Sequence, residues 1–278
     1  MFWNGWTRLV TAFAGTAVVM RRRSRREVNR DGWTAYAKTW DSMRARGEIP
    51  DLDPARAADL EYLGDEWSLM EDDTFSYGVD PRSVETFGEY LRAQLVAPYL
   101  TGRDLRIMEI GPGGGRLTSL LLPHAREIYA VDISSAMLEH LLTRFANEPR
   151  LVPIVTEGTN IDGIEPASLD VAISFDTFVH LEPWEIFRYL EITHRLLRSG
   201  GIGIIHFSDV ETPIGFKLFC AQVPAVIQRG LDCGTFSVMS KSIMTAFLLK
   251  LGFEVVSISN SAFPRDAVAV FRKPAADA

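Results

Sequence analysis

The chain has 278 residues, of which 47% are hydrophobic and 23% are charged, and this suits one large α/β domain with an extension, or at most two domains. Its formal net charge is −7, but residues 1–30 hold seven Arg and one Glu and so carry +6, which leaves −13 on the rest of the chain. Because binding to nucleic acid depends largely on contacts from Lys and Arg to phosphate, the acidic body argues against DNA or bulk RNA as a partner.

The N-terminus combines an apolar stretch with a basic one. Residues 2–20 are mostly apolar and aromatic, and five Arg follow within residues 21–26. A secretory signal would carry its positive charge before the apolar run. A spanning helix needs about 20 apolar residues, whereas only residues 9–20 are uninterrupted here. Two expectations stay open: peripheral contact of residues 1–26 with anionic lipid, or a segment that packs on protein or forms a solvated linker.

Two cysteines, Cys220 and Cys233, occur without a CxxC spacing or a disulfide framework. Small buried thiols in a reducing compartment are the simplest interpretation. We therefore expect a cytoplasmic protein, with association at the inner face of the membrane as the alternative that the N-terminus leaves open.

Residues 31–100 predict a helical extension ahead of a main domain at residues 101–278. Helical patterns occur around residues 33–46 and 54–63, and residues 83–100 place apolar side chains at helical spacing. A Thr-Gly pair ends this last helix.

From residue 105 onward, short apolar runs alternate with helical patterns, which is typical of a parallel sheet covered on both faces. The runs are residues 105–110, 128–131, 151–155, 171–175, 202–207, 253–258 and 267–271. Helices are expected near residues 116–122, 135–145, 183–197 and 240–251. The predicted fold class is α/β, a doubly wound and mostly parallel sheet of seven strands with the N-terminal helical extension. A long irregular insertion at residues 209–239 is expected to form a lid or a wall of the substrate site.

A glycine-rich loop follows the first apolar run. It has the pattern E-x-G-x-G-x-G over residues 109–115, and a helix begins directly after it. Glycines allow a tight turn and let a ligand lie against bare backbone at the carboxyl end of a strand. A dinucleotide-binding loop, G-x-G-x-x-G, would place its third glycine where this chain has Arg116.

An acidic residue, Asp132, follows the second apolar run directly. At the sheet edge its carboxylate can accept two hydrogen bonds from the hydroxyls of a ribose. The alternative is a role in capping the next helix, for Asp132 or for Ser134.

Together with these features, the blocks within residues 105–273 resemble class I S-adenosylmethionine (SAM) dependent methyltransferases, in the family's order. Residues 168–181 resemble a bacterial subgroup whose block ends in "fvHl", many members of which are connected with glycan or small-molecule methylation. Residues 195–201 resemble the family's "RvLrpGG" turn, with Ser199 in place of Pro, and residues 252–255 match its "GFev" block.

The resemblance implies SAM as the cofactor. By position in the motif, Gly111, Gly113 and Gly115 lie against the methionine part of SAM. Glu109 matches the acidic residue that steadies the loop and reaches toward the SAM amino group. The chain shows no metal-ligand spacing, so no metal is assigned.

The remaining predicted cofactor residues lie farther along the chain. Asp132 matches the family's ribose-binding acid, and Ile133 matches the apolar residue beside adenine. Many family members carry an acid where Asn160 stands, close to the adenine amino group. Ile161 and Phe175 complete the predicted cofactor site.

The resemblance further implies methyl transfer to a small-molecule acceptor, with a hydroxyl of a sugar, glycan or lipid-linked intermediate as the expected target. A neutral hydroxyl must lose its proton as the new bond forms, so a general base is needed. His180 is the candidate base because its ordinary pKa suits neutral pH, and Asp176 is the candidate for orienting the acceptor. His180 and Asp176 could instead have structural roles, and a structural role is expected for His206.

Three alternatives stay open at this point. The methyl acceptor could be a nitrogen or a carbon, or the protein could be a catalytically silent scaffold with a SAM-type fold. Segments before the first strand often cover the SAM pocket in this family, so Trp67, Phe75 and Tyr77 are expected either to form a lid or to anchor the helical extension.

Overall fold

The structure, a computed structural model, describes residues 23–45, 84–158 and 160–275. The apolar residues 2–20, the expected helix at residues 54–63 and the aromatic residues Trp67, Phe75 and Tyr77 lie outside this part of the chain. None of the described helices is long and apolar enough to cross a membrane.

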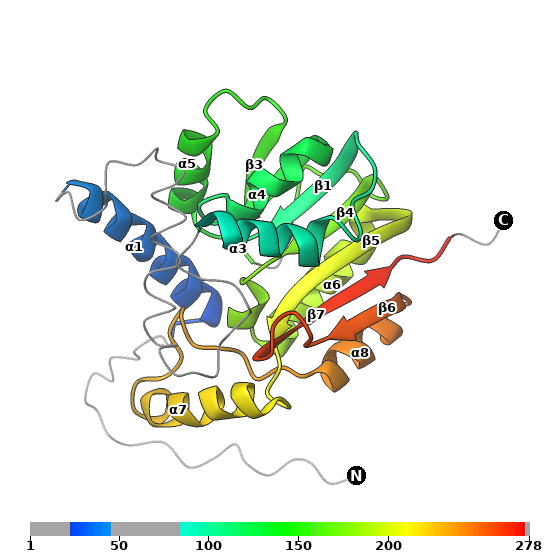
Figure 1. The fold of residues 1–278 in the computed structure, drawn as a ribbon. Coiled ribbons are helices and arrows are strands. Elements are labelled where there is room, and N and C mark those ends of the chain that lie inside the picture. The colour runs from blue at the N-terminus through cyan, green and yellow to red at the C-terminus, as the bar shows by residue number, and fades with distance from the viewer. Residues whose placement is uncertain (1–22, 46–83, 159, 276–278) are drawn as a thin grey trace, which may run out of the picture.

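Seven strands build one sheet (Figure 1). They are β1 (Leu105–Ile110), β2 (Ala125–Asp132), β3 (Leu151–Val155), β4 (Leu169–Ser174), β5 (Leu197–Ser208), β6 (Glu254–Ser259) and β7 (Asp266–Arg272). Their order across the sheet is β3-β2-β1-β4-β5-β7-β6, and β7 runs antiparallel to both of its neighbours. The predicted seven-stranded, mostly parallel α/β sheet is confirmed.

The strand order reverses beside β1, which pairs in parallel with β2 on one side and with β4 on the other. The register aligns Ile110 with Val131, and Glu109 with Ile173. The carboxyl ends of the three strands therefore lie side by side. The loops that follow them meet at one crevice, which is where open α/β sheets bind ligands.

Helices cover both faces of the sheet (Figure 1). They are α1 (Arg25–Ala45), α3 (Val84–Leu91), α4 (Arg116–Leu121), α5 (Ser135–Arg144), α6 (Pro183–Leu196), α7 (Pro213–Arg229) and α8 (Lys241–Lys250). Shorter helical turns are η2 (Arg92–Val96), η3 (Leu122–His124) and η4 (Phe178–His180). The predicted helix over residues 83–100 thus consists of α3 and the π-helical turn η2.

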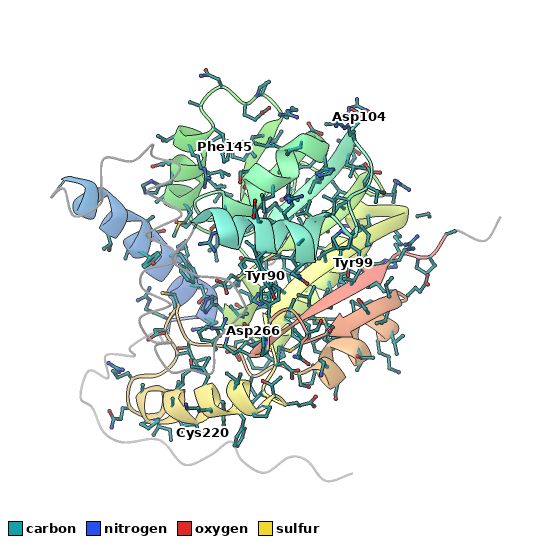
Figure 2. The ribbon with its side chains drawn as sticks, viewed as in Figure 1. Tyr90, Tyr99, Asp104, Phe145, Cys220 and Asp266 are labelled. Carbon is teal, nitrogen blue, oxygen red and sulfur yellow. The ribbon has the colours of Figure 1, made fainter. Side chains whose placement is uncertain are left out.

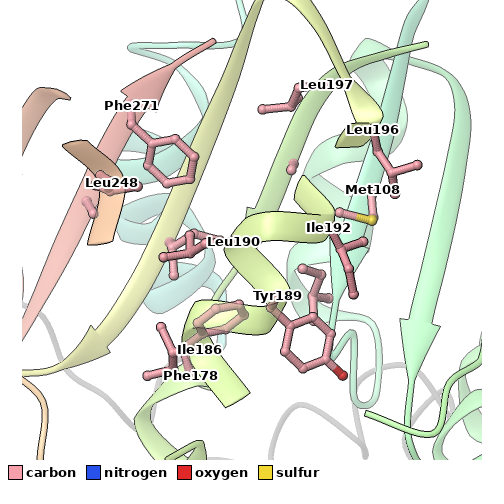
Figure 3. Packing of buried hydrophobic residues seen from close by; sticks show 14 of the residues in the cluster. Met108, Phe178, Ile186, Tyr189, Leu190, Ile192, Leu196, Leu197, Leu248 and Phe271 are labelled. Atoms are coloured by element: carbon pink, nitrogen blue, oxygen red, sulfur yellow. The ribbon is translucent and has the colours of Figure 1, made fainter. Parts of the chain in front are cut away.

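The apolar core has two halves, one on each side of the sheet. On one side, Leu190 of α6 and Leu248 of α8 belong to the same buried cluster as Phe271 of β7 (Figure 3). On the other side, α3, η2, α4 and α5 cover a second buried cluster. Tyr90 of α3 donates a 2.5 Å hydrogen bond to the carbonyl of Ala262 and so ties this layer to the loop before β7 (Figure 2).

The expectation of an irregular insertion at residues 209–239 is wrong for its central part, which forms α7. Thr212 caps the helix by accepting a 2.9 Å hydrogen bond from the N–H of Gly215. Pro213 takes the first helical position, where its missing N–H is not needed. No residue of α7 is fully buried, although Ile214, Leu218 and Phe219 are half-buried at helical spacing. Cys220 is accordingly exposed rather than buried (Figure 2).

The helix α1 begins at Arg25, inside the basic stretch, so a solvated linker through residues 21–26 is ruled out at this end. The guanidinium of Arg25 donates hydrogen bonds to three backbone carbonyls. Those of His180 and Thr235 lie 3.1 and 3.3 Å away, and the third belongs to Asp232. Arg25 thereby joins α1 to η4 and to the segment that follows α7.

The packing of the first half of the core can be tested by a substitution at one position in the sheet. Gly203 of β5 lies opposite Phe271, and a Cβ at position 203 would overlap the aromatic ring of Phe271. The ring is fully buried and packs against Phe253, with 4.6 Å between ring centroids. We expect Gly203→Ala to lower the free energy of unfolding by about 1–3 kcal/mol, measured as a lower urea midpoint at unchanged slope.

Gly88 of α3 is the matched control, because a Cβ there would meet no atom within 4 Å. Gly88→Ala should raise the free energy of unfolding by about 0.5–1 kcal/mol, as alanine does in a helix. Equal effects of the two substitutions would contradict the overlap at position 203.

Candidate functional site

The loop after β1 turns sharply at Gly111, whose φ is +70°. Its N–H donates a 2.8 Å hydrogen bond to the carbonyl of Val131, and its carbonyl accepts a 3.2 Å hydrogen bond from Oγ1 of Thr177. A Cβ at position 111 would overlap the side chain of Thr177. Glycine is therefore required here for both conformation and space.

The other two glycines of the motif have different tasks. Gly113 has a φ of +51°, and a Cβ there would meet no atom within 4 Å, so its backbone borders open space. Gly115 has a φ of +86° and starts α4, and a Cβ there would press on Leu141 and Phe145. Gly115 thus serves the close packing of α4 against α5, whereas Gly113 offers bare backbone to a ligand.

Glu109 is buried directly beneath the loop. Its carboxylate accepts a 2.6 Å hydrogen bond from Oγ1 of Thr118 in α4. Burial raises the pKa of Glu109 to about 7, against the opposing effects of that hydrogen bond and of the positive charge of Arg144. Arg144 in turn donates a 2.8 Å hydrogen bond to the carbonyl of Gly114. Arg144 thus stabilises the loop directly, whereas the role of Glu109 in steadying the loop stays a prediction.

Asp132 and Ser134 have separate roles at the end of β2. The Oγ of Ser134 accepts a 3.4 Å hydrogen bond from the N–H of Met137, so Ser134 caps α5. The Oδ1 of Asp132 accepts a 2.8 Å hydrogen bond from the N–H of Ser134. Burial raises the pKa of Asp132 to about 6, although backbone N–H groups of Ser134, Ile133 and Gly113 act in the opposite direction. This carboxylate borders the crevice, and its hydrogen bonds with the backbone fix its orientation.

The loops after β1, β2 and β4 and one face of α1 form a cleft. The predicted residues that line it are Gly111, Gly113, Asp132, Ile133, Asp176 and His180. Lining residues that were not predicted include Arg26, Asn29, Trp33, Tyr36, Thr177, Glu185 and Tyr189.

The wall formed by α1 comes from one helical face. Arg26, Asn29, Trp33 and Tyr36 are spaced by three, four and three residues, which places them above one another on a helix. The sequence shows this spacing, but it does not show that this face of the helix lines the cleft. The contact depends on packing between α1 and α5, where the hydroxyl oxygens of Thr34 and Ser134 lie 3.0 Å apart.

His180 is held in the cleft by aromatic neighbours and is only 3% exposed. Its ring centroid lies 5.2 Å from that of Trp33 and 5.0 Å from that of Phe236. Neither ring nitrogen makes a well-formed hydrogen bond among the described residues, although an interaction with the backbone of Thr235 acts to raise the pKa of the ring. Burial lowers the pKa of His180 to about 4, although the negative charge of Asp176 acts to raise it. The imidazole is therefore neutral at pH 7 and has a nitrogen available to accept a proton.

Asp176 adopts a left-handed backbone conformation, with a φ of +62°, directly after β4. Its N–H donates a 3.2 Å hydrogen bond to Nδ1 of His206. The proton of the neutral His206 ring therefore lies on Nε2, which is 3.3 Å from Oδ2 of Asp266. Arg265 lies 3.9 Å from the carboxylate of Asp176. His206 is thus part of a buried polar network that positions Asp176, in keeping with the structural role expected for it.

Five predicted cofactor residues are not among those that line the cleft: Glu109 and Gly115, described above, and Asn160, Ile161 and Phe175. Asn160 is exposed, and its amide donates a 2.6 Å hydrogen bond to Asp162. Ile161 is buried within the core. Phe175 packs on the ring of His206, with 4.6 Å between centroids. The family motif gave the position of these residues along the chain, whereas the direction of each side chain depends on local backbone geometry.

Comparison with known proteins agrees with this arrangement. A family model described as a methyltransferase domain matches residues 108–202, which contain the glycine loop, Asp132, Asp176 and His180. A probable ribosomal RNA small subunit methyltransferase A of Pyrobaculum aerophilum is 28% identical over 141 residues, which cover 44% of this chain and 61% of that relative. An uncharacterized methyltransferase of Bacillus cytotoxicus is 28% identical over 202 residues, or 69% of this chain and 89% of the relative.

Solved structures share the fold at low sequence identity. A methyltransferase of Haloferax volcanii, solved in complex with the methyltransferase activator Trm112, superposes with a TM-score of 0.57 at 13% identity and covers 90% of this chain and 99% of its own. Magnesium protoporphyrin IX methyltransferase of Synechocystis, solved with S-adenosylhomocysteine bound, gives a TM-score of 0.55 at 15% identity, with 90% of this chain and all of that chain covered.

The described residues also fit SAM as the cofactor. The backbone at Gly113 borders open space, and the carboxylate of Asp132 lines the same cleft. Buried polar atoms of Asn29 and His180, which have no partner within the described part of the chain, line the cleft as well. Its matched domain, its strand order and its glycine loop are similar to those of class I SAM-dependent methyltransferases.

Proposed function

We propose that the protein transfers the methyl group of SAM to a hydroxyl oxygen of a small-molecule acceptor, and that His180 accepts the proton of that hydroxyl. The observation that carries the proposal is the state of His180, a neutral imidazole with a ring nitrogen that can accept a proton, in the cleft that Asp132 also lines. An oxygen acceptor needs such a base, whereas a neutral amine acceptor already has a lone pair available for the methyl group.

Two features of the cleft support a base role for His180 despite its low pKa. The charge of Asp176 favours the protonated ring, so Asp176 would stabilise the imidazolium as it forms. The low exposure of the ring keeps water from competing with the acceptor hydroxyl. Asp176 would thus act through His180, in addition to any contact with the acceptor.

When bound, SAM supplies a methyl group on a sulfonium that is its own leaving group. The open backbone at Gly113 would hold its methionine part, the carboxylate of Asp132 would accept hydrogen bonds from its ribose hydroxyls, and Ile133 would lie beside adenine. The protein's remaining task is to keep the acceptor oxygen in line with the methyl group and to exclude water. The wall formed by α1 suits that task.

The expected acceptor class is a hydroxyl of a sugar, a glycan or a lipid-linked intermediate. The resemblance of residues 168–181 to a subgroup connected with glycan and small-molecule methylation supports it. The likeness to a ribosomal RNA methyltransferase extends over 44% of this chain, and the acidic charge outside residues 1–30 argues against RNA as the acceptor. A cytoplasmic location, with peripheral contact of residues 1–26 with the inner face of the membrane, would suit a lipid-linked acceptor and stays a prediction.

The proposal is tested by measuring SAM binding and product formation on the same sample. We expect SAM to bind and a methyl group to appear on at least one hydroxyl acceptor from a panel of sugars, glycans and phenols, detected by transfer of labelled methyl from SAM. Binding of SAM without turnover on any acceptor would favour the scaffold alternative. Transfer to an amine or a carbon, but to no hydroxyl, would refute the role given to His180.

The affinity for the cofactor should depend on pH through Asp132. Ribose hydroxyls donate to the ionised carboxylate, so binding should lower the pKa of Asp132 from about 6 and release a proton in acid. Affinity is then full above about pH 6 and weakens as pH falls through that value, by up to about tenfold per pH unit. Calorimetric titration with S-adenosylhomocysteine across this range measures the effect, and Asp132→Asn should remove it. A pH-independent affinity of the unmodified protein would contradict the assignment.

A further inference from the structure

Asn29 of α1 is a buried polar residue that the proposed chemistry does not use. Its side chain is 3% exposed and lines the cleft. Its amide oxygen, Oδ1, has no hydrogen-bond partner among the described residues and is shielded from water. A buried acceptor atom without a partner destabilises a protein, so an unpaired one in a cleft calls for an explanation.

The position of Asn29 on α1 relates it to His180. One turn before it, Arg25 donates a 3.1 Å hydrogen bond to the carbonyl of His180. One turn after it, the ring of Trp33 packs against the ring of His180. Residues four apart lie on the same side of a helix, so Asn29 lies between two residues that both contact His180. Arg26, by contrast, reaches the other end of the cleft, where its guanidinium donates to the carbonyl of Glu157.

Two hydrogen-bond acceptors therefore lie without partners in the same part of the cleft, the Oδ1 of Asn29 and a nitrogen of the neutral His180 ring. A single hydroxyl can donate to only one of them. A molecule that satisfies both must carry a second O–H or N–H group besides the hydroxyl that is methylated.

We propose that Asn29 binds the methyl acceptor, by accepting a hydrogen bond from a second donor group of that molecule, and that the acceptors are therefore diols or similar compounds with two donors. This inference rests on the proposed function, because it takes the hydroxyl at His180 to be the methylated one. Asn29 then fixes the orientation of the acceptor, and α1 is part of the substrate site as well as its cover.

The test compares paired compounds that differ by one donor. The probes are methyl glycosides and their deoxy analogues, and catechol with phenol, titrated calorimetrically into the protein saturated with S-adenosylhomocysteine. This readout does not require turnover. We expect at least one of these compounds to bind about 3- to 10-fold more tightly than its partner that lacks one donor, as one net hydrogen bond provides. Asn29→Leu should remove this difference, while Asn29→Asp, which keeps an acceptor oxygen, should retain most of it.

Thermal unfolding distinguishes a binding role from a structural one. If Asn29 serves the ligand, Asn29→Leu should leave the Tm unchanged or higher, because leucine removes an unpaired buried oxygen while keeping the shape. Lys38→Ala, an exposed change on the same helix, should alter neither Tm nor binding. A lower Tm for Asn29→Leu with the diol preference intact would overturn the proposal. So would weaker binding of S-adenosylhomocysteine itself with the diol preference intact, since Asn29 would then contact the cofactor.

Failure of this inference can be told apart from failure of the proposed function. Diol preference that depends on Asn29, with no methyl transfer to any hydroxyl, would refute the function and leave the binding role standing. Methyl transfer to compounds with one donor at the same efficiency as to diols would refute the role of Asn29 and leave the function standing. If none of the probes binds, the diol class itself is refuted.

Discussion

Replacing His180 with phenylalanine is expected to lower kcat by about 10²–10⁴-fold, the range that loss of a general base produces. Phenylalanine keeps an aromatic ring between Trp33 and Phe236, so the packing of the cleft is retained while the proton acceptor is lost. The affinity for SAM should change little, because the predicted cofactor contacts are made by Gly113 and Asp132. Single-turnover methyl transfer at saturating SAM, together with calorimetric binding of SAM, measures both quantities.

A matched control comes from His124, which is half-buried outside the cleft and whose ring nitrogen Nδ1 lies 3.1 Å from the carbonyl of Gly102. His124→Phe should leave kcat within about twofold. A near-normal rate for His180→Phe would show that His180 only packs, and the acceptor would then not need a base at this position.

The same substitution should also change how stability depends on pH. The pKa of His180 is lowered from 6.5 to about 4 in the folded protein, so the unfolded chain binds the proton more readily between these values. The stabilising contribution of the neutral ring is therefore complete above about pH 6.5 and is lost as pH falls toward 4, by about 3 kcal/mol in all. Chemical unfolding at stepwise lower pH should show this loss in the unmodified protein and a shallower decline in His180→Phe.

Removing the carboxylate of Asp132 should have the second large effect. Asp132→Ala is expected to weaken SAM binding by about 1–3 kcal/mol, or about 5- to 150-fold in Kd, because charged hydrogen bonds to the ribose are lost. The two variants Asp132→Ala and Asp132→Asn should behave alike if the charge matters more than the shape. Calorimetric titration with S-adenosylhomocysteine gives the affinity directly.

Glu139, an exposed acid on α5, provides the control for a simple loss of negative charge. Glu139→Gln should leave the affinity unchanged, and thermal unfolding of all variants checks that they are folded. Unchanged affinity of Asp132→Ala for S-adenosylhomocysteine would show that Asp132 does not bind the cofactor. The loop glycines would then be the main evidence for the cofactor site.

The α/β fold and the centre of the cofactor site could be predicted because their signals are local in the sequence. A buried parallel strand reads as a short apolar run, and the change of direction after β1 needs glycines at particular positions. Asp132 could be assigned because it stands at the carboxyl end of β2, and parallel strands bring these ends to one edge. The alternation of strands and helices predicted the layers, while the antiparallel placing of β7 between β5 and β6 emerged only in the structure.

Other features depend on contacts between distant segments, and these only the tertiary structure decided. The four residues of α1 that line the cleft lie about a hundred positions from Asp132 in the chain, and their role follows from the packing of α1 on α5. The low pKa of His180 results from burial between Trp33 and Phe236, which belong to separate parts of the chain.

The same reason explains why several predicted residues lie away from the cleft. Asn160, Ile161 and Phe175 follow strands at motif positions, but the local backbone directs their side chains to solvent or to the core. The helix α7 has no fully buried residue and contains Pro224, so its helical pattern is weak in the sequence. The sequence by itself determined the fold and the glycine loop after β1, because short-range patterns encode both. The wall that α1 forms was decided by tertiary packing, which brings α1, η4 and the segment after α7 together.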